Sequence, residues 1–229
     1  MIEIINCLDN GYVRLVNVMG SDLTVVNAAR VSYAKESKEL NERDVKLIKF
    51  LAREGHTSPF RHATLQFEVY APLLTARQWW KYIVGSDHVM DAWNESSRRY
   101  ITEDPVFYIP QSNEWRSKPE NSKQGSGNPI NPLEGNNFTN SLKEYIEQGE
   151  KLYNEALNAG ICAEQARLFL PAYSLYVRWY WTASLQSVAH FLNQRLAHDA
   201  QREIQLYAQA VYDLAVQHFP ISLGELVKK

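Results

Sequence analysis

Residues 93–100, WNESSRRY, place a carboxylate, two hydroxyls and two adjacent guanidinium groups between two aromatic rings. Guanidinium groups bind phosphate oxygens through paired N–H donors, and hydroxyls can add hydrogen bonds to the same oxygens. Aromatic faces cover flat ligands such as a nucleobase. The segment therefore suggests recognition of a phosphorylated, planar ligand, although a surface turn can have the same composition.

Three further segments carry similar side chains. GHTSPF at 55–60 offers hydroxyls and an imidazole, and ARQWWK at 76–81 offers an amide and two cations beside two indoles. YVRWYW and FLNQRLAHDAQREIQ place Arg178, Asn193 and Arg195 among aromatic and apolar residues, where a guanidinium needs a carboxylate or a bound anion. Each segment alone is more typical of a turn or a core than of a site. Their combination favours a nucleotide ligand.

The sequence lacks the motifs of several common sites. It contains no G-x-G-x-x-G after a strand, no P-loop, no H-E-x-x-H and no nucleophile elbow. Cys7 and Cys162 lie far apart and outside metal-ligand spacing, so we expect two buried free thiols and no metal site. If the protein is an enzyme, a cofactor carries the difficult step.

The composition is that of a globular protein, with 45% hydrophobic and 22% charged residues among 229. A formal charge of −2 gives no basic field for coating nucleic acid. The N-terminus has early acidic residues and no long apolar run, and the most apolar later stretch, 170–192, is interrupted by Arg178. We therefore expect a soluble, cytoplasmic protein that binds neither nucleic acid nor membranes.

The elements that must position these residues are readable from periodicity. Alternation predicts strands at about 2–7 and 12–18, joined by an Asn-Gly hairpin, and at 64–72 and 174–183. Apolar residues that recur three or four positions apart predict helices at 21–34, 42–53, 73–84, 138–160, 163–169, 184–196 and 198–218. Residues 111–137, rich in Ser, Asn, Pro and Gly, are expected to form a long mobile loop. We expect one α+β domain over residues 1–229, with a small antiparallel sheet and a helix-rich remainder.

Together and in this order, the segments resemble the flavin-dependent thymidylate synthases. The resemblance rests on LVNVMGSDLTVVNAARVSY, GHTSPFRHATLQFEVYAP, ARQWWK, WNESSRRY, FYIP, LPAYSLYVRWYWT and FLNQRLAHDAQREIQLYA. It implies a homotetrameric methyltransferase that makes dTMP from dUMP in active sites built from more than one subunit. It also implies methylenetetrahydrofolate as carbon donor and FAD, reduced by NADPH, as hydride source. The absence of an evident nucleophilic cysteine fits that chemistry.

The resemblance also implies roles for particular residues. Ser97 and Arg195 fall at catalytic positions, and Arg195 is expected to polarise the uracil ring, because a cation beside the imide stabilises negative charge. dUMP is expected to contact Gln78, Trp79, Trp80, Lys81, Glu95, Ser96, Ser97, Arg98, Arg99, Arg178 and Arg195. FAD is expected to contact Ser32, His56, Ser58, Lys81, Glu95, Ser184, Gln186 and His190.

The chain departs from the family's signature of Arg-His-Arg, seven residues and Ser. Lys81, Tyr82 and Ile83 replace the basic triplet, and GSDHVM at 85–90 is an insertion. Lys81 keeps a charge but loses the planar fork, so the residue that supplies the missing flavin contact is open, with His88 as one candidate.

Two other functions therefore stay open. One is an FAD- or nucleotide-binding paralogue without synthase turnover. The other is single-stranded nucleic-acid binding through aromatic rings and arginine, which the lack of net positive charge opposes.

Overall fold

The structure is a computed structural model that describes residues 3–84, 91–101, 103–120 and 125–228. Its described residues form one antiparallel sheet in the order β1-β2-β3-β5-β4. The strands are β1 (Glu3–Cys7), β2 (Gly11–Met19), β3 (Thr64–Pro72), β4 (Ala92–Glu95) and β5 (Tyr176–Ser184). The four predicted strands and the α+β class are confirmed. The sequence does not predict β4, because its four residues show no alternation of their own.

The helices follow the predicted order with shifted ends. They are α1 (Asp22–Arg30), α2 (Glu42–Arg53), α3 (Leu73–Val84), α4 (Pro132–Asn158), α5 (Ala163–Ala166), α6 (Leu185–Arg195), α7 (Arg202–Ala215) and α8 (Pro220–Leu226). Short 3-10 turns lie at η1 (Val31–Tyr33), η2 (Ser58–His62) and η3 (Arg167–Phe169). The predicted helix at 198–218 is shorter at both ends, and α8 was not predicted. Within the described residues, no helix combines the length and hydropathy needed to cross a membrane.

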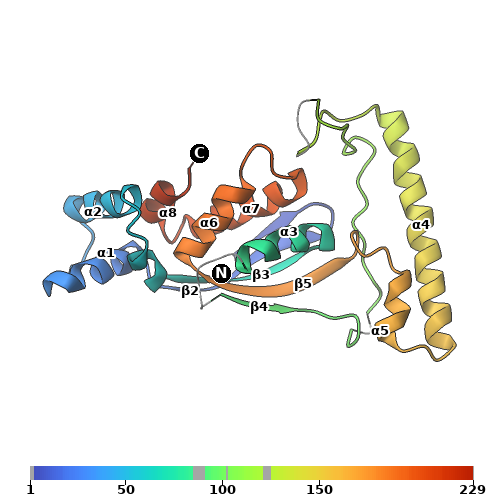
Figure 1. Cartoon of the computed structure of the whole chain (residues 1–229), viewed down its shortest axis with the longest axis horizontal. Helices are drawn as coiled ribbons and strands as arrows, with labels where there is room; N and C mark the ends of the chain where they lie inside the picture. The colour runs from blue at the N-terminus through green and yellow to red at the C-terminus, as the bar shows by residue number, and fades with distance from the viewer. Residues whose placement is uncertain (1–2, 85–90, 102, 121–124, 229) are drawn as a thin grey trace.

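Alternation along the central strands divides the sheet into an apolar and a polar face. Phe67 and Trp181 lie opposite each other on β3 and β5, and both are buried. Glu68 and Tyr180, one position along, also lie opposite each other and point to the other face. Figure 1 shows α3, α6 and α7 on one side of the sheet, with α1, α2 and α8 near one end and α4 and α5 near the other.

Trp79 anchors α3 to this apolar face. Its ring is fully buried and stacks on Phe191 of α6 with centroids 4.3 Å apart. Trp179 and Trp181 of β5 meet the same indole edge-on, at 5.4 and 5.3 Å. Aromatic pairs in these geometries stabilise a core beyond the area that they bury. The position of α3 is therefore fixed by rings from both layers.

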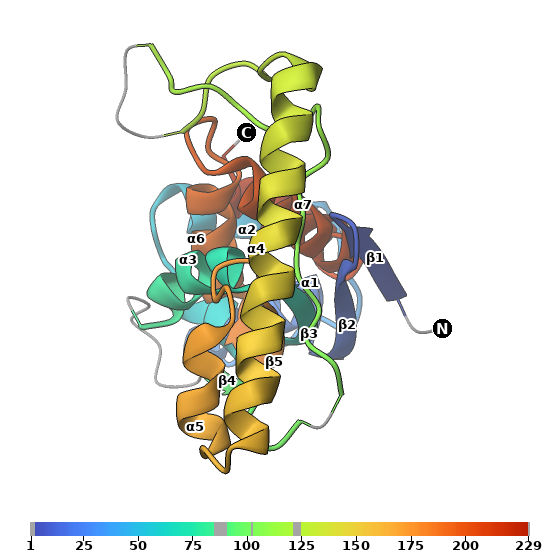
Figure 2. The same cartoon turned by 90° about the vertical axis from the view of Figure 1, so that its right-hand side faces the viewer.

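A second group of buried residues lies under α4, beyond the end of the sheet. Its members are Phe107, Ile146, Tyr153, Ala166, Leu170 and Leu175. Figure 2 shows α4 in front of the sheet end with α5 along its lower half. Gly149 allows α4 to lie close to η3, because a Cβ at this position would lie 2.7 Å from the Phe169 carbonyl oxygen.

Residues 111–120 and 125–131, called the strap from here on, lie between the sheet end and α4. The predicted loop at 111–137 is too long, because α4 already begins at Pro132, with proline in the first turn and the Asn131 side chain as cap. Within the strap, Ser117 N donates to Asn128 O at 2.9 Å, which pairs its two arms.

The two cysteines differ in their surroundings. Cys7 is buried, and burial raises the pKa of its thiol to about 12. Cys162 is exposed, so the prediction of two buried thiols is wrong for this residue. The reason is that Cys162 precedes the four-residue helix α5, and its neighbour Ile161 is also exposed.

The Gly11→Ala substitution should destabilise the fold strongly. A Cβ at Gly11 would lie 1.8 Å from the Tyr207 hydroxyl oxygen, which donates a hydrogen bond to Tyr70 O at 3.0 Å. We expect urea unfolding to show a loss of about 3 kcal/mol, because the tyrosine must move within a packed core. The control is Gly224→Ala in α8, where the new Cβ would meet no described atom within 4 Å outside its own helix. A stabilisation of about 0.5 kcal/mol is expected there, because alanine favours helix over glycine. Equal losses in both variants would contradict this account.

Candidate functional site

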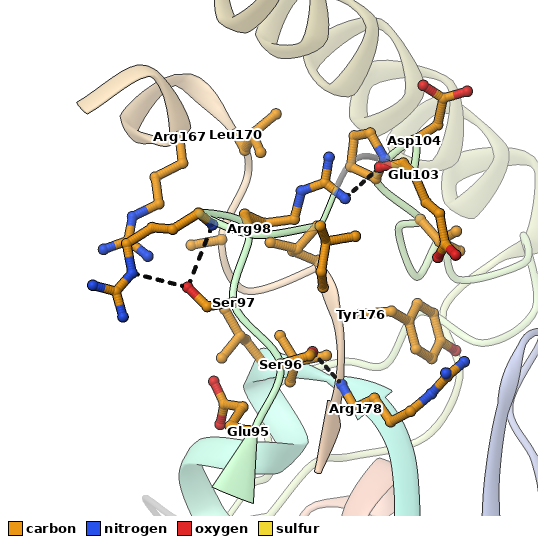
Figure 3. A pocket seen from close by; sticks show the side chains of 18 of the residues that line it. Glu95, Ser96, Ser97, Arg98, Glu103, Asp104, Arg167, Leu170, Tyr176 and Arg178 are labelled. Carbon is orange, nitrogen blue, oxygen red and sulfur yellow. Dashed lines mark hydrogen bonds between the residues drawn. The ribbon is translucent and has the colours of Figure 1, made fainter. Parts of the chain in front are cut away.

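Two cavities hold most of the residues that were predicted to bind a nucleotide. The sheet-end cavity, of about 630 Å³, is lined by Glu95, Ser96, Ser97, Arg98, Arg99 and Arg178 among others (Figure 3). The Arg195 cavity, of about 640 Å³, is lined by Gln78, Lys81 and Arg195 together with residues of the strap and of the α6–α7 loop. Within one chain, the residues predicted to bind dUMP are therefore divided between two separate cavities.

Strand β4 positions the serines of the sheet-end cavity. It pairs with β5 through Glu95 and Trp179, and Ser96 N then donates to Arg178 O at 2.8 Å. The Ser96 hydroxyl accepts from Arg178 N at 3.0 Å, so this serine ties the segment to β5. After it the chain turns, with Tyr100 N donating to Ser97 O at 2.9 Å. The sharp turn presents consecutive side chains to the cavity.

Four guanidinium groups surround the sheet-end cavity. Arg98 donates to the backbone oxygen of Glu103, and Arg99 donates through Nε to the Ser97 hydroxyl at 3.1 Å (Figure 3). Arg178 lies 5.4 Å from the Tyr70 ring centroid. Arg167 of η3 is the fourth, and it was not predicted. The signal was available, because Arg167 directly precedes the LFLPAYSLYVRWYW stretch. Such a cluster is suited to an anion with several oxygens.

Protein carboxylates partly neutralise these cations. Arg99 forms an ion pair with Glu164 at 3.4 Å, and both side chains are solvent-exposed. Arg178 lies 3.8 Å from the buried carboxylate of Glu68, which also forms an ion pair with Arg14. Burial alone would raise the pKa of Glu68, but hydrogen bonds from Tyr12, Arg14 and Tyr180 outweigh it and hold the pKa below its ordinary value.

Arg195 has a different environment. Its terminal nitrogen donates to the Gln78 carbonyl oxygen at 3.1 Å, and its guanidinium lies 4.3 Å from the Tyr82 ring centroid. Its Nε is buried and has no hydrogen-bond partner among the residues that the structure describes. Burial lowers the pKa of Arg195, against the opposing effects of Tyr82 and Asp199. This cation therefore retains unused hydrogen-bonding capacity beside a cavity.

The two tryptophans of ARQWWK point in different directions. Trp79 is fully buried in the core, so its prediction as a ligand contact does not fit this structure. The reason is that the apolar side of α3 faces the sheet. Trp80 is 44% exposed and remains available to a ligand.

The residues predicted to contact FAD fall on several elements. Ser32 is on η1, His56 and Ser58 are on the α2–η2 segment, and all three are exposed. His190 is exposed on α6, with its ring centroid 5.6 Å from that of Tyr82 on α3. The η2 turn with Ser58 packs against α6, and so does α3, on which Lys81 is exposed, whereas Ser32 lies on η1 beside α1.

Of the other predicted FAD positions, Ser184 and Gln186 are less open, whereas Glu95 is exposed at the end of β4. Ser184 is buried and its hydroxyl caps α6 by accepting from Ser187 N at 3.2 Å, which gives it a structural role here. Partial burial raises the pKa of Glu95, against a hydrogen bond from Trp93 and the charge of Arg77. Gln186 Oε1 is buried and lacks a hydrogen-bond donor within the described part of the chain. A buried acceptor without a donor fits a ligand that brings its own N–H or O–H.

The insertion GSDHVM, with the candidate flavin contact His88, lies outside the described residues. Its predicted role stays a prediction.

Comparison with known proteins finds relatives along nearly the whole chain. The family model of thymidylate synthase complementing proteins, Thy1, matches residues 14–221. The flavin-dependent thymidylate synthase of Thermotoga neapolitana is 37% identical over 224 residues, covering 96% of this chain and 93% of the relative. That of Ehrlichia ruminantium (strain Gardel) is 34% identical over 221 residues, covering 96% and 72%. The crystal structure of PolB, a UMP/dUMP methylase from Streptomyces cacaoi bound with 5-Br dUMP, is similar with a TM-score of 0.82 and 29% identity, covering 98% of this chain and 100% of that one.

The contacts of Glu68 predict a pH-dependent contribution to stability. Because its folded-state pKa lies below the ordinary value of 4.5, this stabilisation is complete above that value and is lost as the pH falls through the folded-state pKa. Urea unfolding should show that Glu68→Gln costs about 2 kcal/mol at neutral pH and progressively less as the pH falls below the ordinary value of 4.5. The exposed pair partner Glu164, changed to Gln, should cost close to nothing at any pH. A Glu68→Gln cost that does not change with pH would contradict this explanation.

Proposed function

This chain belongs to the Thy1 family of thymidylate synthase complementing proteins, and from this premise we propose its function. We propose that the protein is a flavin-dependent thymidylate synthase, which methylates dUMP to dTMP with methylenetetrahydrofolate as carbon donor and with FAD reduced by NADPH. The observation that carries this proposal is the arginine cluster around Ser97 at the end of β5. It provides an anion site next to a turn of hydrogen-bonding side chains, as a nucleoside monophosphate requires.

The sheet-end cavity would hold the phosphate. Arg99 and Arg178 supply guanidinium forks, and the Ser97 hydroxyl, which accepts from Arg99 Nε, can donate its own proton to a phosphate oxygen. Glu68 and the Tyr70 ring hold Arg178 before a ligand arrives. The phosphate would replace the exposed Glu164 as partner of Arg99, at little cost because that ion pair is solvated.

The Arg195 cavity would hold the pyrimidine. A cation beside the uracil imide stabilises the negative charge that develops as the ring is activated at C5. The Nε of Arg195 has no partner among the described residues, and burial lowers the pKa of its guanidinium; a charge held away from water in this way is attracted more strongly to an anionic ring. When bound, reduced FAD supplies the hydride. Gln186, His190, Lys81, His56, Ser58 and Ser32 would hold FAD around α6.

The division of the predicted set between two cavities supports assembly across subunits. A nucleotide needs its phosphate and its base bound at once, and the residues for the two parts line separate cavities in one chain. A homotetramer in which the sheet-end cavity of one subunit faces the Arg195 cavity of another would join them. This arrangement is part of the proposed function.

The direct test of the proposed function is a flavin absorbance spectrum followed by tritium release from 5-tritiated dUMP, with methylenetetrahydrofolate and NADPH. FAD-dependent release would support the synthase. A flavin spectrum without release would favour the alternative, a paralogue that binds FAD or nucleotide without turnover. Because PolB is a UMP/dUMP methylase, 5-tritiated UMP belongs in the same assay.

Arg195→Ala should reduce turnover far more than stability. We expect kcat to fall by about 100-fold or more, because the variant lacks the positive charge beside the ring, while Tm changes little. The matched control is Arg43→Ala, an exposed arginine on α2 that lines neither cavity, and both quantities should be unchanged in it. Normal tritium release by folded Arg195→Ala would exclude the proposed role.

A further inference from the structure

A chain of polar contacts connects the strap to the residues of the Arg195 cavity. Arg116 of the strap forms an ion pair with Glu203 of α7. Gln201 Nε2 donates to the other carboxylate oxygen of Glu203 at 2.7 Å, and Gln78 Nε2 donates to Gln201 Oε1. The backbone oxygen of Gln78 accepts from Arg195. Figures 1 and 2 both show the strap beside the α6–α7 loop that carries Gln201.

Glu203 determines which group donates and which accepts along this series of hydrogen bonds. It is 5% exposed and forms the ion pair with Arg116, and the oxygens of a carboxylate can only accept hydrogen bonds. Gln201 must therefore turn its NH₂ group toward Glu203 and its carbonyl oxygen away from it. That oxygen faces Gln78, so Gln78 must use its own NH₂ group there. The carbonyl oxygen of the Gln78 amide is then left over.

The remaining oxygen of Gln78 has no donor from any residue that the structure describes. Gln78 lines the Arg195 cavity, beside the guanidinium of Arg195. The cavity therefore combines an acceptor with a neighbouring donor. The N3–H and adjacent carbonyl of a uracil ring match this pair, whereas the ring nitrogen N3 of cytosine carries no hydrogen and would face the Gln78 oxygen lone pair to lone pair.

We propose that Glu203 is a positioning residue that, through Gln201 and Gln78, makes the Arg195 cavity select uracil over cytosine nucleotides. Glu203 touches no ligand in this scheme. It acts by determining which end of the Gln201 and Gln78 amides, the oxygen or the NH₂ group, faces each neighbour. The inference rests on the proposed function in placing a pyrimidine in the Arg195 cavity.

The test is calorimetric binding of dUMP and dCMP to the FAD-loaded oligomer. We expect wild type to prefer dUMP strongly, because the mismatched ligand leaves buried polar groups unpaired. In Glu203→Gln the new amide can donate as well as accept, so the preference should fall by about tenfold. Gln201→Met breaks the same chain without changing a charge and should lower the preference similarly.

Two controls separate this inference from a loss of folding. Glu225→Gln makes the same chemical change at a carboxylate of α8 that pairs with Lys49 of α2, and the dUMP preference should be unchanged. If Glu203→Gln does not fold, Gln201→Met decides, because Gln201 is only half-buried and uncharged. An unchanged preference in a folded Glu203→Gln or Gln201→Met protein would overturn the inference, even if wild type makes dTMP. Wild type that binds no dUMP at all would overturn the proposed function as well.

Discussion

The packing of Trp79 against the sheet determines where the residues that line the two cavities can lie. One indole contacts Phe191 of α6 and two tryptophans of β5, so α3 is held by both layers of the core. Since a helix rises about 1.5 Å per residue, Leu73 and Lys81 are roughly 12 Å apart along α3. Leu73 lines the sheet-end cavity and Lys81 lines the Arg195 cavity. The buried tryptophan thus fixes one wall of each cavity.

Strand β5 serves the core and the proposed site at the same time. Trp179 and Trp181 enter the core, while Arg178, between Val177 and Trp179, points the other way. The Arg178 side chain is 55% exposed on the polar face of the sheet, and the carboxylate of Glu68 on the neighbouring strand β3 lies within 3.8 Å of it. This contact and the Tyr70 ring hold Arg178 at the edge of the sheet-end cavity.

The arginines differ in how the protein neutralises them. Arg99 is paired with Glu164, Arg116 with Glu203, and Arg178 lies near Glu68. Arg195 forms no ion pair with a carboxylate in the described part of the chain; it contacts a backbone oxygen and an aromatic ring instead. A partly buried cation without a counter-ion has most to gain from a ligand that becomes negative. This difference is the physical reason for proposing that Arg195 contacts the pyrimidine ring, and that the other arginines contact the phosphate or stabilise the fold.

The sequence by itself determined the main strands, most of the helices and the family, because periodicity and capping are local and the quoted motifs span nearly the whole chain. It also predicted Ser97, Arg99, Arg178 and Arg195 as site residues, and each of the four lines one of the two cavities. Tertiary structure alone decided that Trp79 is core and Ser184 is a cap, since both outcomes depend on which face of a helix meets the sheet. It also added Arg167 to the sheet-end cavity and Glu203 to the Arg195 cavity network. These contacts join segments far apart in the chain, where no local pattern can report them.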